Sequence, residues 1–435
     1  MNISIIGSGY VGLVSGACFA ELGNKVICAD NDVNKVERLK KGIIPIYEPG
    51  LKELISINVK KKRLNFTSSI KDAVAKSEVI FIAVGTPSLP NGEADLTYIE
   101  NVARRIAENM PGYRLIVEKS TVPVQTGQWV KHTIETYVGK KIKFDVASNP
   151  EFLREGQAIA DFMRPDRVVI GVESEKAKEI LTNLYKPLNA PIVVTDIKSA
   201  ELIKHASNSF LATKISFANA LARICDKVGA DVGEVSRGMG MDKRIGKAFL
   251  RAGIGYGGSC FPKDLDAFVS ISEKIGYDFE LLKAVKNINQ QQKEFFLGKI
   301  KDSLWIIKDK TIAVLGISFK PDTDDIRNAP SVEIIDALVK EGAKIKAYDP
   351  QAIPKVKKLF KQIEFCTDSY QACRSSDCLV ILTEWDEFKE LDLAKIKKLL
   401  RRPLVIDGRN IYDPAQMKKM GFSYISIGRK AVTNK

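Results

Sequence analysis

The sequence predicts an α/β protein in which two doubly wound domains, each built on a parallel sheet, are joined by a long central helix. Two segments, residues 2–30 and 311–349, each show a buried strand, a glycine turn and a second strand closed by an aspartate. Between them, residues 199–228 have the apolar periodicity of a helix that is buried on several sides. We therefore predict domains at residues 1–198, 199–305 and 306–435.

The first thirty residues follow the order strand, glycine turn, helix, strand. The successive segments are residues 2–6, the turn Gly7-Ser8-Gly9-Tyr10-Val11-Gly12, residues 13–22, and residues 25–29 followed by Asp30. Further strands are expected at residues 79–84, 115–118 and 144–148, with helix-like stretches between them. This alternation predicts a Rossmann-like parallel sheet over roughly the first two hundred residues.

The glycine turn predicts a site for NAD. Its pattern, GxGxxG between a strand and a helix, permits a tight turn and close approach of the backbone to a pyrophosphate. Asp30 would accept hydrogen bonds from the ribose hydroxyls and repel a 2′-phosphate, which favours NAD over NADP. The alternative is a glycine turn that serves packing alone.

The central helix and the second strand pattern have different expected roles. At about 1.5 Å per residue, the helix over residues 199–228 spans roughly 40 Å, long enough to link two domains and to pack against a second subunit. We therefore predict a homodimer through it. The second pattern lacks the full glycine motif, since Gly316 is followed by Ile317-Ser318-Phe319-Lys320, and we expect it to hold a different ligand.

The composition is that of an ordered protein, with 45% hydrophobic and 28% charged residues. The apolar start, residues 1–14, lacks a basic leader and is interrupted by glycines, and no other apolar run is long enough to span a membrane. Seven cysteines without a CxxC pair indicate thiols rather than disulfides. We expect a cytoplasmic protein without a membrane partner.

The net charge is positive, because 67 basic residues against 53 acidic ones leave +14. This charge fits anionic ligands, with nucleic acid as the alternative. Basic runs such as residues 60–63 lack interleaved aromatic residues, which favours a solvated surface, so we expect no nucleic-acid partner. With only His132 and His205 present, neither a His-rich metal site nor a Ser-His-Asp relay is expected.

A glycine-rich loop surrounds one cysteine. Residues 253–264, GIGYGGSCFPKD, combine four glycines with Cys260, Lys263 and Asp264. Such a backbone suits close approach to a polar ligand, and a cysteine there acts as a nucleophile where a cation or a helix start favours its thiolate. On composition alone, a buried structural cysteine fits Cys260 equally well.

Two polar residues of the central helix, Lys204 and Asn208, lie four residues apart and hence on one face. If that face meets the Cys260 loop, an ammonium and an amide would stabilise a developing oxyanion. In isolation the two residues are a polar stripe. The neighbouring His205 is expected to be a hydrogen-bonded packing residue.

Polar residues also follow three successive strands of the first domain. They form the segments 85–87, 118–123 and 149–156, at strand ends where open α/β sheets present ligand contacts. The glutamates of the last segment, NPEFLREG, suit proton transfer or simple capping. Three polar strand ends in succession favour a binding site.

These segments together resemble the UDP-glucose/GDP-mannose dehydrogenase family over essentially the whole chain. The blocks that carry the resemblance occur in the order that the family shows: GSGYVG, IYEPGL, VGTPS, KSTVP, NPEFLREG, KHASNSFLATKISFANAL, GYGGSCFPKD, GISFKPDTDDIRNAP and DGRN. The resemblance implies NAD contacts from Gly7, Gly9, Tyr10, Val11, Gly12, Asp30, Lys35, Thr86, Thr121, Glu155, Lys263 and Arg327. It implies substrate contacts from Glu151, Phe152, Leu153, Lys204, Asn208, Arg244 of a partner subunit, Arg251, Tyr256, Gly257, Lys320 and Arg409. It implies no metal.

In enzymes of this family the sugar alcohol is oxidised to an aldehyde, which Cys260 would capture here as a thiohemiacetal. A second NAD takes the next hydride, and the resulting thioester would be hydrolysed by a water that Asp264, Thr121 or Glu155 positions. Lys204 and Asn208 would stabilise the oxyanion. A cysteine is needed because an aldehyde yields a second hydride only after a nucleophile has added to it.

The substrate that the resemblance implies is UDP-glucose, oxidised to UDP-glucuronate. Phe261 follows the cysteine as in the UDP-glucose branch, whereas leucine is usual in the GDP-mannose branch. Ser259 stands where the branch that oxidises N-acetylated UDP-sugars commonly has histidine. The alternatives are a dehydrogenase for GDP-mannose or a UDP-N-acetylhexosamine, a two-electron β-hydroxyacid dehydrogenase that would not use Cys260, and a binding protein without activity.

Overall fold

The computed structural model describes residues 1–139 and 142–433, which form two compact units. Unit 1 contains Met1–Ser207 with Asp266–Tyr277, and unit 2 contains Asn208–Leu265 with the chain from Asp278 onward. Two helices, α9 (Ile197–Val228) and α11 (Phe261–Lys274), contribute to both units. Within the described ranges, no helix is long and apolar enough to cross a membrane.

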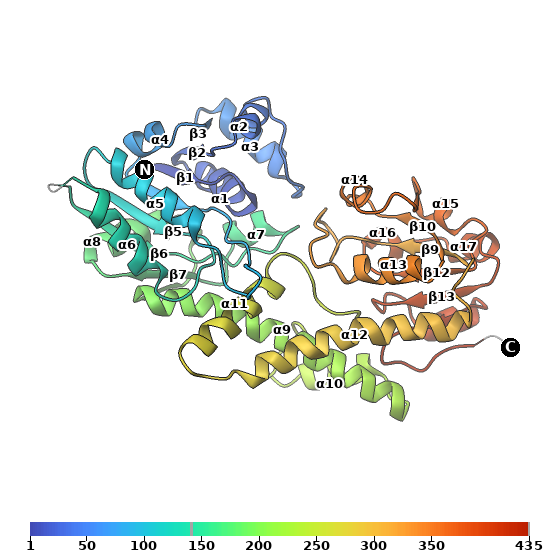
Figure 1. The fold of residues 1–435 in the computed structure, drawn as a ribbon. Coiled ribbons are helices and arrows are strands. Elements are labelled where there is room, and N and C mark those ends of the chain that lie inside the picture. The colour runs from blue at the N-terminus through green and yellow to red at the C-terminus, as the bar shows by residue number, and fades with distance from the viewer. Residues whose placement is uncertain (140–141, 434–435) are drawn as a thin grey trace. The chain divides into compact units, whose positions relative to one another are not determined.

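In its described residues, unit 1 has a sheet of eight strands, drawn from blue to green in Figure 1. The strands are β1 (Asn2–Ile6), β2 (Lys25–Ala29), β3 (Leu64–Thr67), β4 (Val79–Ile82), β5 (Arg114–Glu118), β6 (Phe144–Ser148), β7 (Val168–Val172) and β8 (Ile192–Thr195). Their order is β3-β2-β1-β4-β5-β6-β7-β8, and all neighbours are parallel except β6 and β7. The strand order reverses at β1, between β2 and β4, where open sheets of this kind bind ligands.

Helices cover both faces of this sheet. They are α1 (Tyr10–Glu21), α2 (Val33–Lys40), α3 (Leu51–Lys60), α4 (Ile70–Lys76), α5 (Thr97–Asn109), α6 (Thr126–Tyr137), α7 (Ala158–Met163) and α8 (Glu175–Tyr185), with a 3₁₀ turn at Lys186–Leu188. Successive strand residues point to opposite faces: Leu115 and Val117 of β5 pack in the core beneath α1, α3, α7 and α8, and Ile116 packs beneath α4, α5 and α6. This two-sided burial explains why a central strand such as β4, with the sequence VIFI, is apolar along its whole length.

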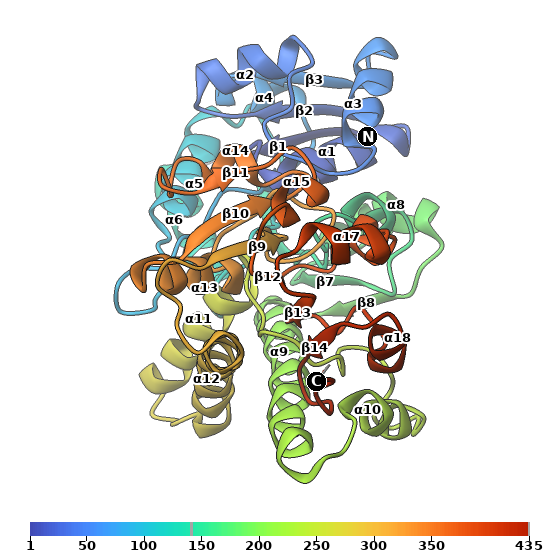
Figure 2. The same ribbon diagram turned by 90° about the vertical axis from the view of Figure 1, so that its right-hand side faces the viewer.

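The helical part of unit 2 is built on the second half of α9. Helix α12 (Glu280–Leu304) lies beside it, as both views show (Figures 1 and 2). Ser216 Oγ donates to Val285 O at 3.0 Å, and Arg223 Nη1 donates to Gln291 Oε1 at 2.8 Å. Helix α10 (Val232–Gly240) follows α9, and the carboxylate of the preceding residue, Asp231, caps it by accepting the N–H groups of Gly233 and Glu234.

The remaining described part of unit 2 is a parallel sheet of six strands with the order β11-β10-β9-β12-β13-β14. The strands are β9 (Thr311–Leu315), β10 (Lys344–Tyr348), β11 (Glu364–Phe365), β12 (Cys378–Ile381), β13 (Leu404–Asp407) and β14 (Ser423–Ile425). The helices are α13 (Pro330–Lys340), α14 (Ile353–Val356), α15 (Ser369–Cys373), α16 (Asp386–Lys389), α17 (Leu393–Leu399) and α18 (Pro414–Lys419). The predicted α/β architecture, with two Rossmann-like sheets and a long central helix, is confirmed.

Candidate active site

The glycine turn after β1 has the shape of a dinucleotide-binding turn. Gly7 has a φ of +105°, and a Cβ there would lie 2.5 Å from Ala83 O, so only glycine fits. A Cβ on Gly12 would lie 1.9 Å from Gly7 O, because α1 packs directly on the turn. By contrast, no described atom lies within 4 Å of a Cβ on Gly9, and no side chain caps the start of α1. This open space beside the first N–H groups of α1, which begins with Tyr10 and Val11, fits a pyrophosphate.

Asp30 closes β2 and is oriented by the same turn. Its Oδ2 accepts hydrogen bonds from Ser8 N at 2.8 Å, Ser8 Oγ at 2.7 Å and Lys35 Nζ at 2.8 Å. Burial alone would raise the pKa of Asp30, but the hydrogen bonds from Lys35 and Ser8 outweigh it and hold the pKa below its ordinary value. The carboxylate is therefore ionised at neutral pH and able to accept the hydroxyls of a ribose.

The ends of β4 and β5 are joined through two threonines. Thr86, which follows β4, donates from Oγ1 to the carbonyl of Thr121 at 2.9 Å, and Ser120 Oγ donates to Val84 O at 2.8 Å. Thr86 is buried and Thr121 is partly exposed. The structure thus brings two predicted cofactor contacts together at the carboxyl edge of the sheet.

Lys204 of α9 forms a buried ion pair with Glu151, which follows β6. The Nζ–Oε1 distance is 3.0 Å, and both side chains are almost fully buried. Glu151 Oε2 also accepts Leu153 N at 2.6 Å, and the Lys204 ammonium lies 5.4 Å from the centre of the Phe152 ring. The NPEFLREG loop therefore surrounds this ammonium with a carboxylate and an aromatic ring.

A second lysine, Lys119, is buried near this pair and was not among the predicted contacts. Its Nζ donates to Asn149 Oδ1 at 2.9 Å. Burial lowers the pKa of Lys119 to about 7, with Glu151 opposing the shift and Lys204 adding to it. The polar strand end KSTVP indicated a ligand edge here, but no local pattern shows that one of its side chains is fully enclosed.

Cys260 directly precedes α11 in unit 2. Asp264 N donates to the Cys260 carbonyl at 2.8 Å, so the thiol lies at a helix N-terminus, where the helix dipole stabilises a thiolate. Cys260 is partly exposed, whereas the other cysteines of the described ranges are buried. Burial raises the pKa of Cys18 and of Cys28 to about 12, which makes such thiols poor nucleophiles. The surroundings of Cys260 therefore favour the catalytic interpretation over the structural one.

Three further predicted residues gather beside this cysteine. Asn208 Nδ2 donates to Asp264 Oδ2 at 2.6 Å, and Lys263 Nζ lies 3.0 Å from Asp264 Oδ1. Asn208 and Asp264 are both buried. Unit 2 thus brings an amide, a carboxylate and an ammonium together at the first turn of α11, which Cys260 directly precedes, although Asn208 and Asp264 are far apart in the sequence.

The glycines before Cys260 allow two backbones to pack closely. A Cβ on Gly257 would lie 2.3 Å from Asn328 O, and one on Gly258 would lie 2.8 Å from the Phe319 ring. Gly258 has a φ of +84°, and its N–H donates to Arg327 O at 2.9 Å. These glycines are therefore required by packing, which fixes the loop that leads to Cys260.

Arg409 follows β13 and is largely buried in unit 2. Its Nε donates to Leu382 O at 2.8 Å, its Nη2 donates to Phe319 O at 3.2 Å, and it forms an ion pair with Glu384 at 3.2 Å. Burial lowers the pKa of Arg409, and Glu384 counteracts that shift. Arg251 Nη2 donates to the Arg409 carbonyl at 3.0 Å, so two guanidinium groups predicted to meet an anion lie near each other. Glu384, which balances this charge, was not predicted.

Two other predicted arginines pair with nearby aspartates. Arg327 Nη2 lies 2.6 Å from Asp325 Oδ2, and Arg244 Nη2 lies 2.6 Å from Asp242 Oδ2. The Arg244 side chain is 89% exposed, so its proposed role at a partner's site stays a prediction. Both guanidinium groups remain partly available to an anion.

Tyr256 and Lys320 complete the predicted set. Both backbone groups of Tyr256 bond the Asn289 side chain, N to Oδ1 at 2.9 Å and Nδ2 to O at 3.1 Å. The Lys320 ammonium lies 5.6 Å from the centre of the Phe319 ring. The loop and the segment after β9 are thus held by contacts inside unit 2.

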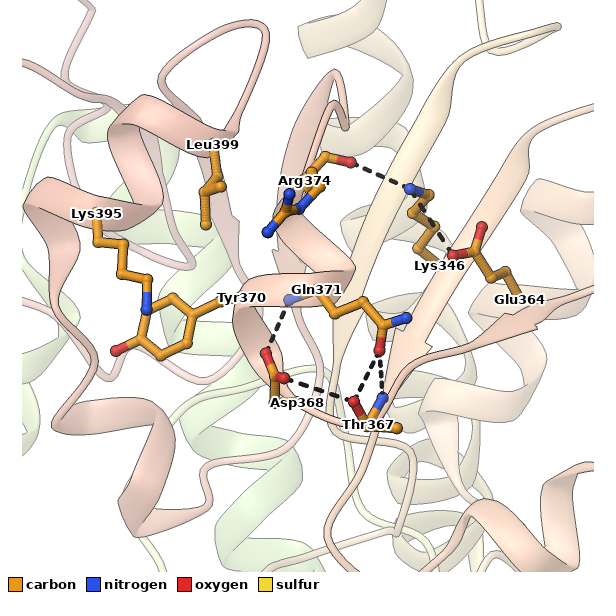
Figure 3. Close-up of a pocket in the computed structure, with 9 residues that line it drawn as sticks. All are labelled: Lys346, Glu364, Thr367, Asp368, Tyr370, Gln371, Arg374, Lys395 and Leu399. Carbon is orange, nitrogen blue, oxygen red and sulfur yellow. Dashed lines mark hydrogen bonds and ion pairs between the residues drawn. The ribbon is translucent and has the colours of Figure 1, made fainter.

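An open cavity of about 560 Å³ lies elsewhere in unit 2, along α15 and beside α17 (Figure 3). Its polar groups mostly bond one another: Gln371 Oε1 accepts Thr367 N at 2.8 Å, and Asp368 Oδ1 accepts Gln371 N at 2.8 Å. Lys395 Nζ lies 3.8 Å from the centre of the Tyr370 ring. No predicted site residue lines this cavity.

Comparison with known proteins decides the family. Residues 1–189 match the NAD binding domain of the UDP-glucose/GDP-mannose dehydrogenase family, residues 198–291 its central domain and residues 313–414 its UDP binding domain. The chain belongs to this family. Its cofactor is NAD, and the glycine turn and Asp30 of unit 1 fit that cofactor.

Relatives within the family align over nearly the full chain. The UDP-glucose 6-dehydrogenase TuaD of Bacillus subtilis is 51% identical over 432 residues, which cover 99% of this chain and 94% of TuaD. The UDP-glucose 6-dehydrogenase of Rhizobium meliloti is 48% identical over 437 residues, which cover 99% of this chain and 100% of that protein. The predicted family recognition is confirmed.

Solved structures of the family have the same fold. A UDP-glucose dehydrogenase from Pyrobaculum islandicum superposes with a TM-score of 0.92 at 38% identity, covering 98% of both chains. A UDP-D-ManNAc dehydrogenase from Pyrococcus horikoshii superposes with a TM-score of 0.86 at 28% identity, covering 99% of both chains. The fold is therefore shared between family members named for different sugars.

Proposed function

We propose that this protein oxidises UDP-glucose to UDP-glucuronate, reducing two NAD molecules for each sugar. The observation that carries the proposal is the partly exposed Cys260 at the start of α11, with Asn208, Lys263 and Asp264 gathered beside it. The names of relatives that are 48% and 51% identical to this chain support UDP-glucose as the substrate. Bound NAD supplies the hydride acceptor for each oxidation.

The proposed chemistry uses Cys260 between the two oxidations. The C6 alcohol of the sugar loses a proton and a hydride to become an aldehyde, and the Cys260 thiolate adds to its carbonyl carbon. The thiohemiacetal loses a second hydride and a proton to give a thioester, and water cleaves the C–S bond to release the carboxylate and the thiol. Asn208 donates a hydrogen bond to the developing oxyanion, and Lys204 contributes a positive charge.

The hydrolytic water needs an acceptor for its proton. Asp264 Oδ2 accepts from Asn208, and Oδ1 lies beside the Lys263 ammonium, so these contacts orient the carboxylate in the first turn after Cys260. Thr121 and Glu155 of unit 1 are the other proposed positions for this role. Arg251, Lys320 and Arg409 of unit 2 supply positive charge for the diphosphate.

The first test measures NADH formed per UDP-glucose consumed, with excess NAD and purified protein. Two NADH with UDP-glucuronate as product support the proposal, and one NADH contradicts the role of Cys260. GDP-mannose and a UDP-N-acetylhexosamine serve as competing substrates, and turnover of either in preference to UDP-glucose overturns the choice of sugar.

The role of the thiol is tested separately. Cys260→Ser should stall before acid release. Hydrolysis of a serine ester would have to expel an alkoxide, which is a poorer leaving group than a thiolate. Cys225→Ser, which changes a buried cysteine of the same unit, is the matched control for the loss of a thiol. Acid release at the wild-type rate by Cys260→Ala would exclude covalent catalysis at this position.

We further propose a homodimer through α9. Phe210, Phe217, Ile224 and Val228 lie along this helix and are 53–70% exposed in the single chain. Their spacing of seven, seven and four residues puts them on one face, which is an apolar surface that a second copy would cover. Light scattering should show a dimer for the wild type and dissociation for Phe217→Glu, and a wild-type monomer with full activity would contradict the proposal.

The proposed location is the cytoplasm. Within the described ranges no cysteine forms a disulfide, which is the usual state of proteins in a reducing compartment. Fractionation of cells with an antibody against the chain tests this location, and recovery outside the cytoplasm contradicts it.

A further inference from the structure

A buried carboxylate that takes no part in the proposed chemistry joins two segments of unit 1. Glu48 lies in the loop between α2 and α3 and is 6% exposed. Its Oε2 accepts Gly156 N at 2.6 Å, and its Oε1 accepts Ala158 N at 2.7 Å. Its Oε2 also accepts the hydroxyl of Tyr10. All three donors are far from Glu48 in the sequence.

The segments that Glu48 joins are both parts of the proposed NAD site. Tyr10 is the first residue of α1, directly after Gly9 of the glycine turn. Gly156 directly follows Glu155 and has a φ of +82°, so the chain turns sharply there before α7 begins at Ala158. The Tyr10 hydroxyl also accepts Gly156 N at 3.2 Å, which closes a triangle between the three residues.

Glu155 itself lies close to this triangle. Burial raises the pKa of Tyr10 well above its ordinary value, and the charges of Glu48 and Glu155 add to the rise. The Tyr10 hydroxyl is thus near both carboxylates and donates to that of Glu48. The direction in which Glu155 leaves the turn is set by the contacts of the next residue with Glu48.

The network requires a carboxylate and not merely a polar group. Both oxygens of Glu48 accept backbone N–H groups, so neither can be replaced by an amide nitrogen without placing two donors against each other. Glutamine at this position keeps the size and loses one acceptor. Aspartate keeps both acceptors on a shorter side chain.

We propose that Glu48 is a positioning residue that ties the start of α1 to the Glu155–Gly156 turn and so holds Glu155 against bound NAD. The proposal rests on the proposed function and on the NAD contact that the family resemblance implies for Glu155. It assigns to Glu48 an effect on the cofactor rather than on the sugar, because its contacts lie on the glycine-turn side of unit 1.

The experiment compares Glu48→Gln, Glu48→Asp and the control Glu21→Gln with the wild type. Glu21 ends the same helix α1 and pairs with Arg63 at 2.9 Å, away from the turn. Calorimetry gives the Kd for NAD, initial rates give kcat and both KM values, and thermal unfolding reports folding. Glu48→Gln should raise the Kd and KM for NAD about tenfold, the effect of one buried hydrogen bond lost. Its kcat should fall while KM for UDP-glucose stays near the wild-type value.

The outcomes separate this inference from the proposed function. Partial recovery of NAD affinity in Glu48→Asp and wild-type affinity in Glu21→Gln support positioning. A folded Glu48→Gln with wild-type NAD affinity and kcat overturns it, and so does unfolding of both Glu48 variants, which assigns a structural role. Failure of the wild type to oxidise UDP-glucose sinks the proposed function, whereas the calorimetric comparison still tests Glu48.

Discussion

The two parallel sheets begin with the same local arrangement and then diverge. In unit 1, Gly7 follows β1 and Asp30 accepts the N–H and hydroxyl of Ser8. In unit 2, Gly316 follows β9 with a φ of +87°, and Asp349 accepts the N–H and hydroxyl of Ser318. The aspartate after the second strand thus holds the turn after the first strand in both sheets.

The two turns differ in the chain segment that comes after each of them. Helix α1 begins three residues after Gly7, whereas the next helix after Gly316, α13, begins only at Pro330. Asp30 receives a lysine ammonium, but Asp349 receives the indole N–H of Trp385 at 3.3 Å and is 1% exposed. The first turn therefore presents a helix start and a charged acid to a ligand, and the second encloses its acid. The same arrangement of two strands and a turn can therefore either bind NAD or only stabilise its own turn.

The strongest test of this difference fills the open side of the first turn. Gly9→Val should fold, because no described atom lies within 4 Å of a Cβ there, yet its side chain would occupy the space of the pyrophosphate. We expect kcat/KM for NAD to fall on the order of 100-fold, as for a ligand displaced by about 1 Å. Initial rates and thermal unfolding check this. Wild-type kinetics in Gly9→Val would place the dinucleotide elsewhere.

A paired substitution sharpens the comparison of the two acids. Asp349→Asn should lower the free energy of unfolding by about 1–3 kcal/mol, since Oδ1 and Oδ2 both accept buried N–H groups, and should leave the Kd for NAD unchanged. Asp30→Asn should weaken NAD binding and reduce discrimination against NADP. Urea unfolding and calorimetry measure the two effects. Equal loss of NAD affinity in both variants would contradict the division of roles.

The smallest expected effect concerns the pH dependence of stability. The pKa of Asp30 is lower in the folded chain, so its contribution is present above the unfolded value of about 3.9 and is lost as pH falls through the folded pKa. Lys35→Ala removes the cation and moves the folded pKa upward. The difference in unfolding free energy between wild type and Lys35→Ala should therefore shrink toward zero on acidification. If this difference in unfolding free energy stayed constant with pH, Lys35 would not stabilise the protein through the ionised form of Asp30.

Local patterns predicted the elements of the fold well. The predicted strands at residues 2–6, 25–29 and 144–148 coincide with β1, β2 and β6, because apolar runs between turns leave little choice. The antiparallel placement of β7 beside β6 was not predicted. This pairing depends on the direction in which the chain re-enters the sheet after the NPEFLREG loop. The apolar periodicity of a single strand does not specify that direction.

The sequence predicted which residues belong to the site, but not most of the contacts between them. The resemblance named Lys204 and Glu151 together as substrate contacts, but their ion pair joins residues 53 positions apart and only the fold brings them together. Glu48 lies within the quoted block IYEPGL, yet its partners Tyr10, Gly156 and Ala158 come from three other places in the chain. Contacts of this kind depend on tertiary packing, which a local pattern does not contain.

The unequal burial of the cysteines makes the protein suited to selective chemical labelling. A thiol-reactive fluorophore added under native conditions should attach first at Cys260, because burial shields the remaining thiols of the described ranges. No cysteine would have to be removed by mutagenesis. The attached dye would report on the surroundings of the proposed nucleophile, and protection by an added nucleotide sugar would be measured as a slower labelling rate.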